Sequence, residues 1–134
     1  MNVYVVIDTN VLVSAMLTHN LQAATIKVAD AVVNGKIVPL YNDEILAEYN
    51  EVMHRGKFGF SEEDISRMIE TVTLFGEMAS RVLSDDEVKD PKDVVFYEVA
   101  LSKKDAYLVT GNIRHFPRKP IVVTPAELVE ILNL

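Results

Sequence analysis

Short apolar segments rich in β-branched residues alternate along the chain with longer segments whose apolar residues recur at helical spacing. This alternation predicts a parallel sheet, because parallel neighbours need long crossover connections, which helices usually provide. The expected strands are residues 3–7, 37–41, 81–83, 106–109 and 121–123. The expected helices are residues 21–34, 42–55, 61–75, 90–103 and a final one beginning at Pro125. The pattern indicates an α/β fold with helices on both faces of the sheet.

The composition is that of one folded domain covering residues 1–134. Hydrophobic residues make up 49% of the chain and charged residues 25%, which argues against disorder. Cysteine is absent, which excludes disulfides, thiolate metal sites and a cysteine nucleophile. No apolar stretch is long enough to span a bilayer, and the N-terminus lacks the pattern of a signal peptide. We therefore expect a cytoplasmic protein with no membrane partner.

Polar residues follow two of the expected strands directly. "VYVVIDTN" carries a continuously apolar strand into Asp8, and "YLVTGN" carries another into Thr110, Gly111 and Asn112. A continuously apolar strand is typical of one buried on both faces. In open parallel sheets the functional crevice lies beyond the carboxyl ends of the strands. Asp8, Thr110 and Asn112 should therefore open toward the same edge of the sheet.

Two further carboxylates are expected near that edge. Glu48 borders the buried stripe of its helix more closely than Glu44 or Glu51 do. Asp93 lies one helical turn after Asp90, at the start of a helix whose N-terminal dipole tolerates an anion. Taken singly, each could be an ordinary turn, surface or capping residue. Taken together, three carboxylates with few basic neighbours in sequence need a positive charge between them, and all-oxygen ligands suit Mg²⁺ or Mn²⁺.

Four stretches of the chain resemble the successive motifs of the PIN-domain family, in particular of its small VapC-like toxins from bacteria and archaea. They are "VIDTNVLVSA", "EILAEYNEVM", "DPKDVVFYEVALSKKDAYLVTGN" and "RHFP". The resemblance runs from Val3 into the C-terminal helix. It implies a metal-dependent ribonuclease with a five-stranded parallel sheet ordered 3-2-1-4-5. It also implies a protein that is often dimeric and often neutralised by an antitoxin.

The resemblance assigns the family's acidic positions residue by residue. Its first, second and third acidic residues correspond to Asp8, Glu48 and Asp93, with Asp90 the less favoured alternative to Asp93. The family's fourth acidic position follows Thr-Gly and is Asn112 in this chain. A neutral oxygen there would hold a second metal ion less firmly, so one firmly bound ion is expected. Asn10, Thr110 and Asn112 would orient water or phosphate by hydrogen bonds.

The formal net charge is −7, with 13 basic and 20 acidic residues, so a general nucleic-acid-binding surface is not indicated. Two local basic segments lie next to the motifs, and phosphate contacts are expected from them. For Phe116, which lies within one of these segments, a core position is favoured over base stacking. The candidate RNA-binding residues are Arg114, His115, Arg118 and Lys119 in "IRHFPRK", and Arg55 and Lys57 in "HRGKF".

Two other functions remain open at this stage. A catalytically weakened PIN domain could act as an RNA- or protein-binding module. "VIDTNVL" also resembles the first motif of haloacid-dehalogenase-like phosphatases, but Asn10 stands where that family has its acid/base aspartate.

A homodimer is expected, with apolar residues of the region 42–79 in its interface. The amphipathic helices in this region have more apolar surface than one small sheet face needs to cover it.

Overall fold

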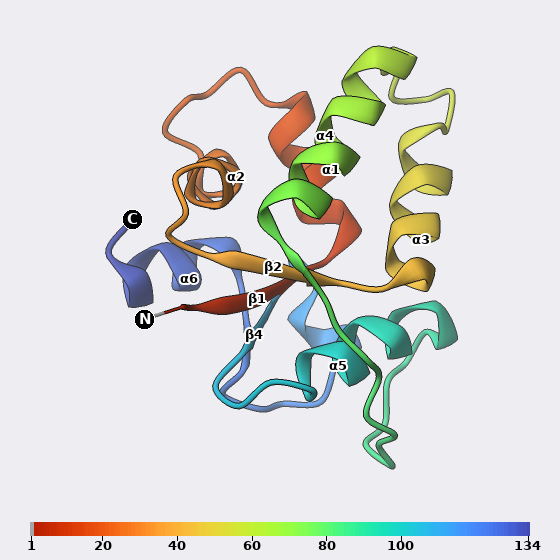
Figure 1. Cartoon of the computed structure of the whole chain (residues 1–134), viewed down its shortest axis with the longest axis vertical. Helices are drawn as coiled ribbons and strands as arrows, with labels where there is room; N and C mark the ends of the chain where they lie inside the picture. The colour runs from red at the N-terminus through yellow and green to blue at the C-terminus, as the bar shows by residue number, and fades with distance from the viewer. Residues whose placement is uncertain (1) are drawn as a thin grey trace.

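The computed structural model describes residues 2–134 and contains one five-stranded sheet, ordered β3-β2-β1-β4-β5, in which every neighbouring pair of strands is parallel (Figure 1). This α/β fold and its strand order confirm the expectation from the sequence. The strands are β1 (Tyr4–Ile7), β2 (Val38–Tyr41), β3 (Glu77–Met78), β4 (Tyr107–Val109) and β5 (Val122–Val123). The α-helices are α1 (Thr9–Leu17), α2 (Ala24–Val33), α3 (Asp43–Met53), α4 (Glu62–Phe75), α5 (Val94–Ala100) and α6 (Pro125–Leu132). Two 3₁₀ turns are η1 (Pro91–Asp93) and η2 (Ile113–His115).

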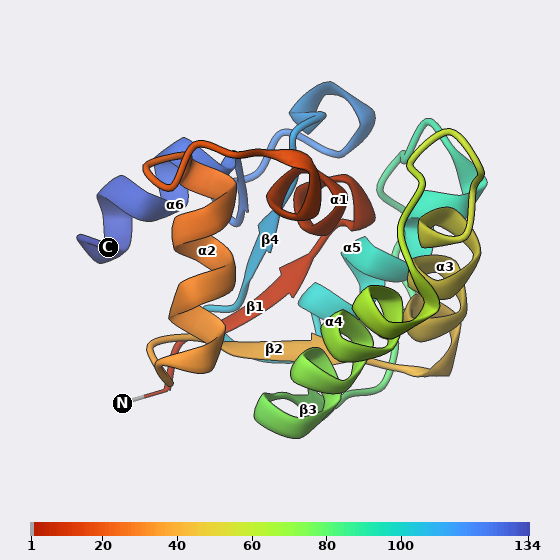
Figure 2. The same ribbon diagram turned by 90° about the horizontal axis from the view of Figure 1, so that it is seen from above.

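Helices cover both faces of the sheet. Helix α5 packs against β1, β2 and β4 on one face, while α1, α2 and α4 lie over the other (Figure 1). Seen from above, α2, α1 with α4, and α3 lie side by side across that second face (Figure 2). Helix α3 contacts both α4 and α5, so it joins the two layers next to the carboxyl end of β1. This position matters because α3 and α5 carry two of the predicted site residues.

Two adjacent strands of the sheet, β1 and β4, are buried in the core. Val5, Val6 and Ile7 of β1 are fully buried, as are Leu108 and Val109 of β4. Their continuous apolar sequence is what a strand covered by helices on both faces requires. A polar residue that follows such a strand therefore emerges directly from the core at the edge of the sheet.

The helix starts follow from capping residues. The side chain of Asn42 accepts a hydrogen bond from the backbone N–H of Ile45, and that of Ser61 accepts one from Asp64. Each cap satisfies a backbone donor that the first helical turn leaves free. The Asn42 cap sets the start of α3, which fixes the rotation at which its later residues meet the core.

Two expectations about the elements are wrong, and one helix was not expected. Residues 81–83 form no strand, and the third strand is the two-residue pair Glu77–Met78. Gly76 permits this, because a Cβ atom there would lie 2.3 Å from the carbonyl oxygen of Pro39. Helix α1 was not anticipated, and the helix expected over 90–103 consists of the turn η1 followed by the shorter α5.

Within residues 2–134, no helix is both long enough and apolar enough to cross a membrane.

Candidate active site

Asp8 and Thr110 meet at the carboxyl edge of the sheet, which confirms that β1 and β4 open toward the same side. The Thr110 hydroxyl donates a 2.7 Å hydrogen bond to Oδ2 of Asp8. The backbone N–H of Asp8 donates to the carbonyl oxygen of Val109, at 3.0 Å. Asp8 is only 6% exposed and Thr110 is fully buried. Two strands distant in sequence thus fix the position of one buried carboxylate.

Burial shapes the electrostatics of Asp8. Loss of hydration raises the pKa of the Asp8 carboxyl above its ordinary value. The hydrogen bonds from Thr110 and from the Thr9 backbone, and the nearby His115, act in the opposite direction but do not offset the burial. Asp8 is therefore a carboxylate whose charge the protein alone stabilises poorly.

Asp93 lies within electrostatic range of the other acidic candidates. It is half-buried where η1 joins α5, and burial raises its pKa to about 6, helped by the negative charges of Asp8, Asp90 and Glu48. Nδ1 of His115 lies 3.8 Å from Oδ2 of Asp93 and partly opposes this shift. The structure thus brings the three predicted acidic residues, together with Asp90, into one region of negative charge.

Helix α3 presents Glu48 beside a buried tyrosine. Glu48 is half-buried, whereas Glu44 and Glu51 are exposed, as the helical phase of the sequence predicted. The next residue, Tyr49, is fully buried and donates a 2.5 Å hydrogen bond from its hydroxyl to the carbonyl oxygen of Ile7. Its ring also packs against Phe96 of α5, with a centroid distance of 6.1 Å. Tyr49 therefore ties the helix that carries Glu48 both to the end of β1 and to α5.

The polar residues around the carboxylates occupy different positions. Asn112 is exposed, and its backbone N–H donates a 3.0 Å hydrogen bond to the Thr110 hydroxyl. Asn10 is also exposed, in the first turn of α1. Oδ1 of Asp90 accepts a hydrogen bond from the backbone N–H of Lys92 and so caps η1. Asp90 thus has a local structural use, which agrees with its place behind Asp93 as a candidate ligand.

Sequence reasoning missed Thr9. Its hydroxyl is the one buried side-chain polar atom without a hydrogen-bond partner among the described residues, and it follows Asp8 directly. Buried polar groups normally find a partner, so an unpaired hydroxyl is a feature that needs an explanation. Its only signal in the sequence is its place between Asp8 and Asn10.

The oxygen donor atoms and the negative charge of the acidic residues suit a divalent cation. Oxygen donors without cysteine suit hard ions such as Mg²⁺ and Mn²⁺, and a cation would relieve the repulsion that raises the Asp93 pKa. Their side chains do not yet converge: within residues 2–134, no three Asp, Glu or His side chains are grouped closely enough to hold a metal ion. In this geometry Asp8, Glu48 and Asp93 do not form a three-ligand group.

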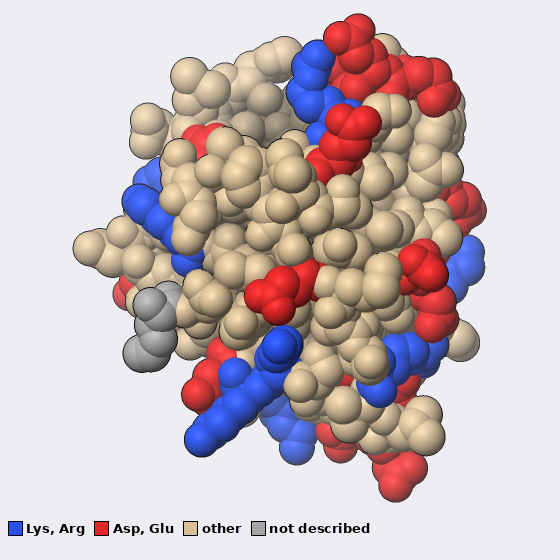
Figure 3. Space-filling view, viewed as in Figure 1, with Lys and Arg blue, Asp and Glu red and all other residues tan. Residues whose placement is uncertain are grey.

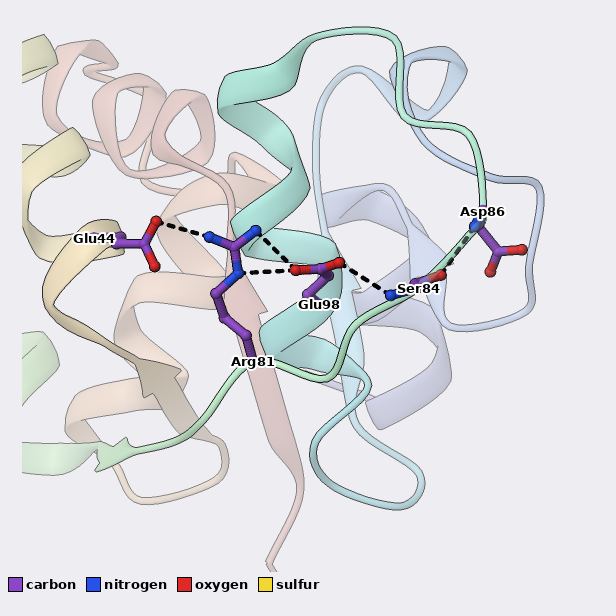
Figure 4. A network of polar contacts seen from close by, with 5 residues as sticks. All are labelled: Glu44, Arg81, Ser84, Asp86 and Glu98. Carbon is purple, nitrogen blue, oxygen red and sulfur yellow. Dashed lines mark hydrogen bonds and ion pairs between the residues drawn. The ribbon is translucent and has the colours of Figure 1, made fainter.

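A second network, unforeseen from the sequence, links α3 and α5 through an ion pair between Arg81 and the buried Glu98 (Figure 4). The guanidinium of Arg81 bonds to Oε1 of Glu98 in α5, at 2.7 and 2.8 Å, and to Oε2 of Glu44 in α3, at 2.8 Å. Glu98 is only 3% exposed, and its other oxygen accepts from the backbone N–H of Ser84, at 3.0 Å. Arg81 and Glu98 lie 17 positions apart, so no local motif pairs them.

The predicted RNA-binding residues fall into two separate groups. Arg114, Arg118 and Lys119 line one groove, and His115 precedes Phe116, which is buried as expected. Arg55 and Lys57 lie elsewhere, in the turn after α3. There Arg55 is 3.7 Å from Glu51, and the Lys57 ammonium lies 5.2 Å from the centre of the Phe58 ring. Only the first group adjoins Asp93, through His115.

This fold and this acidic edge define a class of α/β proteins in which a parallel sheet presents carboxylates beyond its strand ends. Comparison with protein families then identifies the family. The sequence model of the PIN domain matches residues 4–114, and the chain belongs to the PIN-domain family. PIN domains are generally metal-dependent nucleases. No curated protein and no solved structure was similar enough to count as a match.

Proposed function

We propose that this protein is a Mg²⁺- or Mn²⁺-dependent endoribonuclease whose metal ligands are Asp8, Glu48 and Asp93. One observation carries the proposal: the buried Asp8, held by Thr110, lies at the sheet edge within electrostatic range of Asp93, whose pKa it raises. Carboxylates placed so that they disfavour one another's charge cost stability, and a bound cation offsets that cost. Asn112 would add a neutral oxygen, so we expect one firmly bound ion.

A divalent cation at this place would polarise a phosphodiester and lower the pKa of a bound water. The chain's own groups supply the positioning. Thr110 fixes the Asp8 carboxylate through the 2.7 Å hydrogen bond, and Tyr49 holds α3 so that Glu48 stays beside β1. Asn10 and Asn112 are exposed at this edge and are able to bond to water or to a phosphate oxygen. None of these residues has to act as a nucleophile.

The test is cleavage of a fluorescent single-stranded RNA with Mn²⁺, Mg²⁺ or EDTA. We expect cleavage by the natural protein with either metal ion and none with EDTA. Asp8→Asn should abolish cleavage and weaken Mn²⁺ binding in a calorimetric titration. Asp85→Asn, at an exposed residue, removes the same charge and should leave both unchanged. Cleavage by Asp8→Asn at the natural rate would refute the nuclease proposal.

A binding module without catalysis is the second candidate. It is favoured by Asn112 in place of a fourth acidic residue and by the absence, within residues 2–134, of a preformed three-ligand group. This candidate predicts RNA binding without metal-dependent cleavage. The haloacid-dehalogenase-like alternative predicts hydrolysis of a small phosphate ester such as p-nitrophenyl phosphate. The same protein preparation, assayed on both substrates, separates the three functions.

We further propose that the chain acts as one PIN domain over residues 1–134, in the cytoplasm, as the toxin of a toxin–antitoxin pair with a cognate antitoxin partner. This rests on family resemblance, and a small antitoxin gene next to its own would support it.

We also propose a homodimer through the region 42–79, where Leu74 and Met78 are 78% and 62% exposed. Light scattering at micromolar concentration should give twice the mass of the chain, and a monomer would contradict this.

A further inference from the structure

A groove of about 1030 Å³ opens beside the candidate site, between the segment that follows β4 and helix α6. Figure 2 shows that segment, in blue, extending beyond the carboxyl end of β4. The groove is lined by four basic residues and by one acidic residue, Glu127. The basic residues are Lys89, Arg114, Arg118 and Lys119. In a chain with a net charge of −7, this is a local reversal of sign.

The positive charge in the groove is not used by the fold. Among the described residues, none of the four basic side chains lies within 4.0 Å of an acidic oxygen. The Glu127 carboxylate is occupied by the capping box of α6, where Oε1 accepts from the backbone N–H of Thr124, at 2.8 Å. Asp86 is near enough for Lys119 to lower its pKa, but it bonds to the Tyr97 hydroxyl instead. Within residues 2–134, the groove therefore presents cations that form no ion pair.

Lys89 comes from a different part of the sequence than the other three. Its backbone N–H donates a 3.1 Å hydrogen bond to the carbonyl oxygen of His115, which fixes it beside η2. It also immediately precedes Asp90 and the turn that carries Asp93. The groove thus begins next to the acidic residues, with His115 at the junction, 3.8 Å from Asp93. Lys89 and His115 therefore link the groove to the part of the chain that carries Asp93.

The lining of the groove is mixed, which bears on the kind of polymer. Apolar side chains also line the groove, among them Ile113, Pro117 and Ile131. A single strand exposes both phosphates and base faces, whereas a duplex stacks its bases inside. On the face shown in Figure 3, by contrast, Lys and Arg side chains lie among Asp and Glu side chains.

We propose that this basic groove binds the single-stranded RNA segment flanking the cleaved bond, with Lys89 and Arg118 contacting its phosphates. The proposal rests on the nuclease function above for its substrate and adds where the strand lies. It also separates the groove from Arg55 and Lys57, the other basic group expected to contact RNA.

The test measures binding of a fluorescent 12-nucleotide oligouridine by anisotropy in EDTA, so that no cleavage occurs. Three double variants each remove two basic side chains: Lys89→Ala/Arg118→Ala in the groove, Arg55→Ala/Lys57→Ala after α3, and Lys36→Ala/Lys104→Ala at exposed positions near the amino ends of β2 and β4. Circular dichroism melting checks that each variant folds.

We expect the groove variant to lose at least about 10-fold in affinity, and the slope of log K against log salt to fall by about 1.4, since each phosphate contact to a single strand contributes ~0.7. The Lys36/Lys104 variant should stay within about 2-fold of the natural protein, and the Arg55/Lys57 variant should lose less affinity than the groove variant. A duplex of matched length should bind at least about 10-fold more weakly than the single strand.

Three results would overturn the proposal: an unchanged affinity of the groove variant, a larger loss in the Arg55/Lys57 variant, or equal competition by polyglutamate of the same charge. The last would indicate a site for acidic protein segments instead. The nuclease proposal and the groove proposal can be refuted independently. RNA binding through the groove without metal-dependent cleavage would refute only the nuclease proposal. Metal-dependent cleavage by the natural protein, together with an unchanged RNA affinity of the groove variant, would refute only the groove proposal.

Discussion

The hydroxyl of Tyr49 donates a 2.5 Å hydrogen bond to the carbonyl oxygen of Ile7, and both groups are buried. Ile7 immediately precedes Asp8, and Tyr49 immediately follows Glu48. One hydrogen bond therefore connects the backbone beneath one proposed metal ligand to the helix that carries another. Asp8 is also close enough to raise the pKa of Tyr49 beyond the effect of burial alone.

Tyr49→Phe is expected to weaken both the fold and the metal site. It leaves the Ile7 carbonyl oxygen without this donor, and such a loss costs about 1–3 kcal/mol of unfolding free energy. Freed from β1, α3 should hold Glu48 less firmly, and Mn²⁺ affinity should fall by roughly 10-fold, as is typical when a group that orients a ligand is lost. Urea unfolding and calorimetric titration measure the two effects.

Tyr97→Phe is the matched control, because its hydroxyl bonds to Asp86, which is not a proposed metal ligand. It should leave Mn²⁺ affinity unchanged. Equal effects of the two substitutions on Mn²⁺ binding would show that Tyr49 does not position Glu48.

The metal-free protein should lose stability as the pH rises from about 4 to about 6. The pKa of Asp93 is raised from its ordinary 3.8 to about 6, so the folded state holds this proton more tightly than the unfolded state does. Where the folded state binds more protons, unfolding free energy falls with rising pH. Asp93→Asn should flatten this slope and make the metal-free protein more stable than the natural one at pH 7.

Urea unfolding in EDTA at several pH values between 4 and 7 measures the slope. Asp85→Asn serves as control and should keep the slope of the natural protein. If Asp93→Asn kept it as well, Asp93 would not be the group that titrates. Added Mn²⁺ should stabilise the natural protein more at pH 7 than at pH 5, because the ion binds the ionised carboxylates.

Arg81→Ala should destabilise the protein, because it breaks the network of Figure 4. It leaves Glu98, which is only 3% exposed, with a single backbone donor. Removing one partner of a buried pair costs about 3–5 kcal/mol, and the partial exposure of the Arg81 side chain, 33%, places the expected loss at the lower end. Adding Glu98→Gln to Arg81→Ala should restore part of this loss, since the unpaired charge is gone.

Arg67→Ala is the control, because its pairs with Glu63 and Asp64 lie on the surface of α4, and exposed pairs contribute up to about 1 kcal/mol. Thermal melting of the four proteins gives the comparison. A loss for Arg81→Ala no greater than that for Arg67→Ala would mean that Glu98 tolerates burial without its partner.

The layout of the sheet could be predicted from the sequence because buried parallel strands carry their own signal. Segment 3–7 is continuously apolar, and the polar residues that follow β1 and β4 mark the carboxyl edge. Strand β3 carries no such signal: two residues at the edge of a sheet are too few for a pattern, and Gly76 is informative only once its contact with Pro39 is known. Helix α1 was missed because its residues continue the apolar run of β1 past Asp8, with no cap hydrogen bond from the Asp8 side chain.

The candidate site likewise contains residues that the sequence could predict and residues that it could not. Asp8 and Thr110 follow strands, and Glu48 follows from helical phase, so local pattern was sufficient to place them. Lys89 and the pair of Arg81 with Glu98 depend on contacts between distant segments, which neither spacing nor charge reveals. The unpaired hydroxyl of Thr9 likewise appears only when burial is known.

Asn112→Asp should strengthen metal binding, because it adds a negative charge at the position that the family resemblance assigns to a fourth acidic residue. Asn112 is exposed, and its backbone N–H bonds to the Thr110 hydroxyl, which in turn bonds to Asp8. A further carboxylate so near a divalent ion should raise Mn²⁺ affinity on the order of 10-fold, or ~1.4 kcal/mol. Without metal it adds repulsion toward Asp8 and Asp93, and exposure limits the lost stability to under about 1 kcal/mol.

Asn34→Asp supplies the control for this substitution, since it places the same charge at the exposed end of α2, before the amino end of β2. It should change neither Mn²⁺ affinity nor the difference in melting temperature with and without Mn²⁺. For Asn112→Asp that difference should widen from both sides, because the metal-free protein melts earlier and the metal-bound protein later. If Mn²⁺ affinity were the same for Asn112→Asp as for the natural protein, residue 112 would not face the metal, and the fourth family position would have no counterpart in this site.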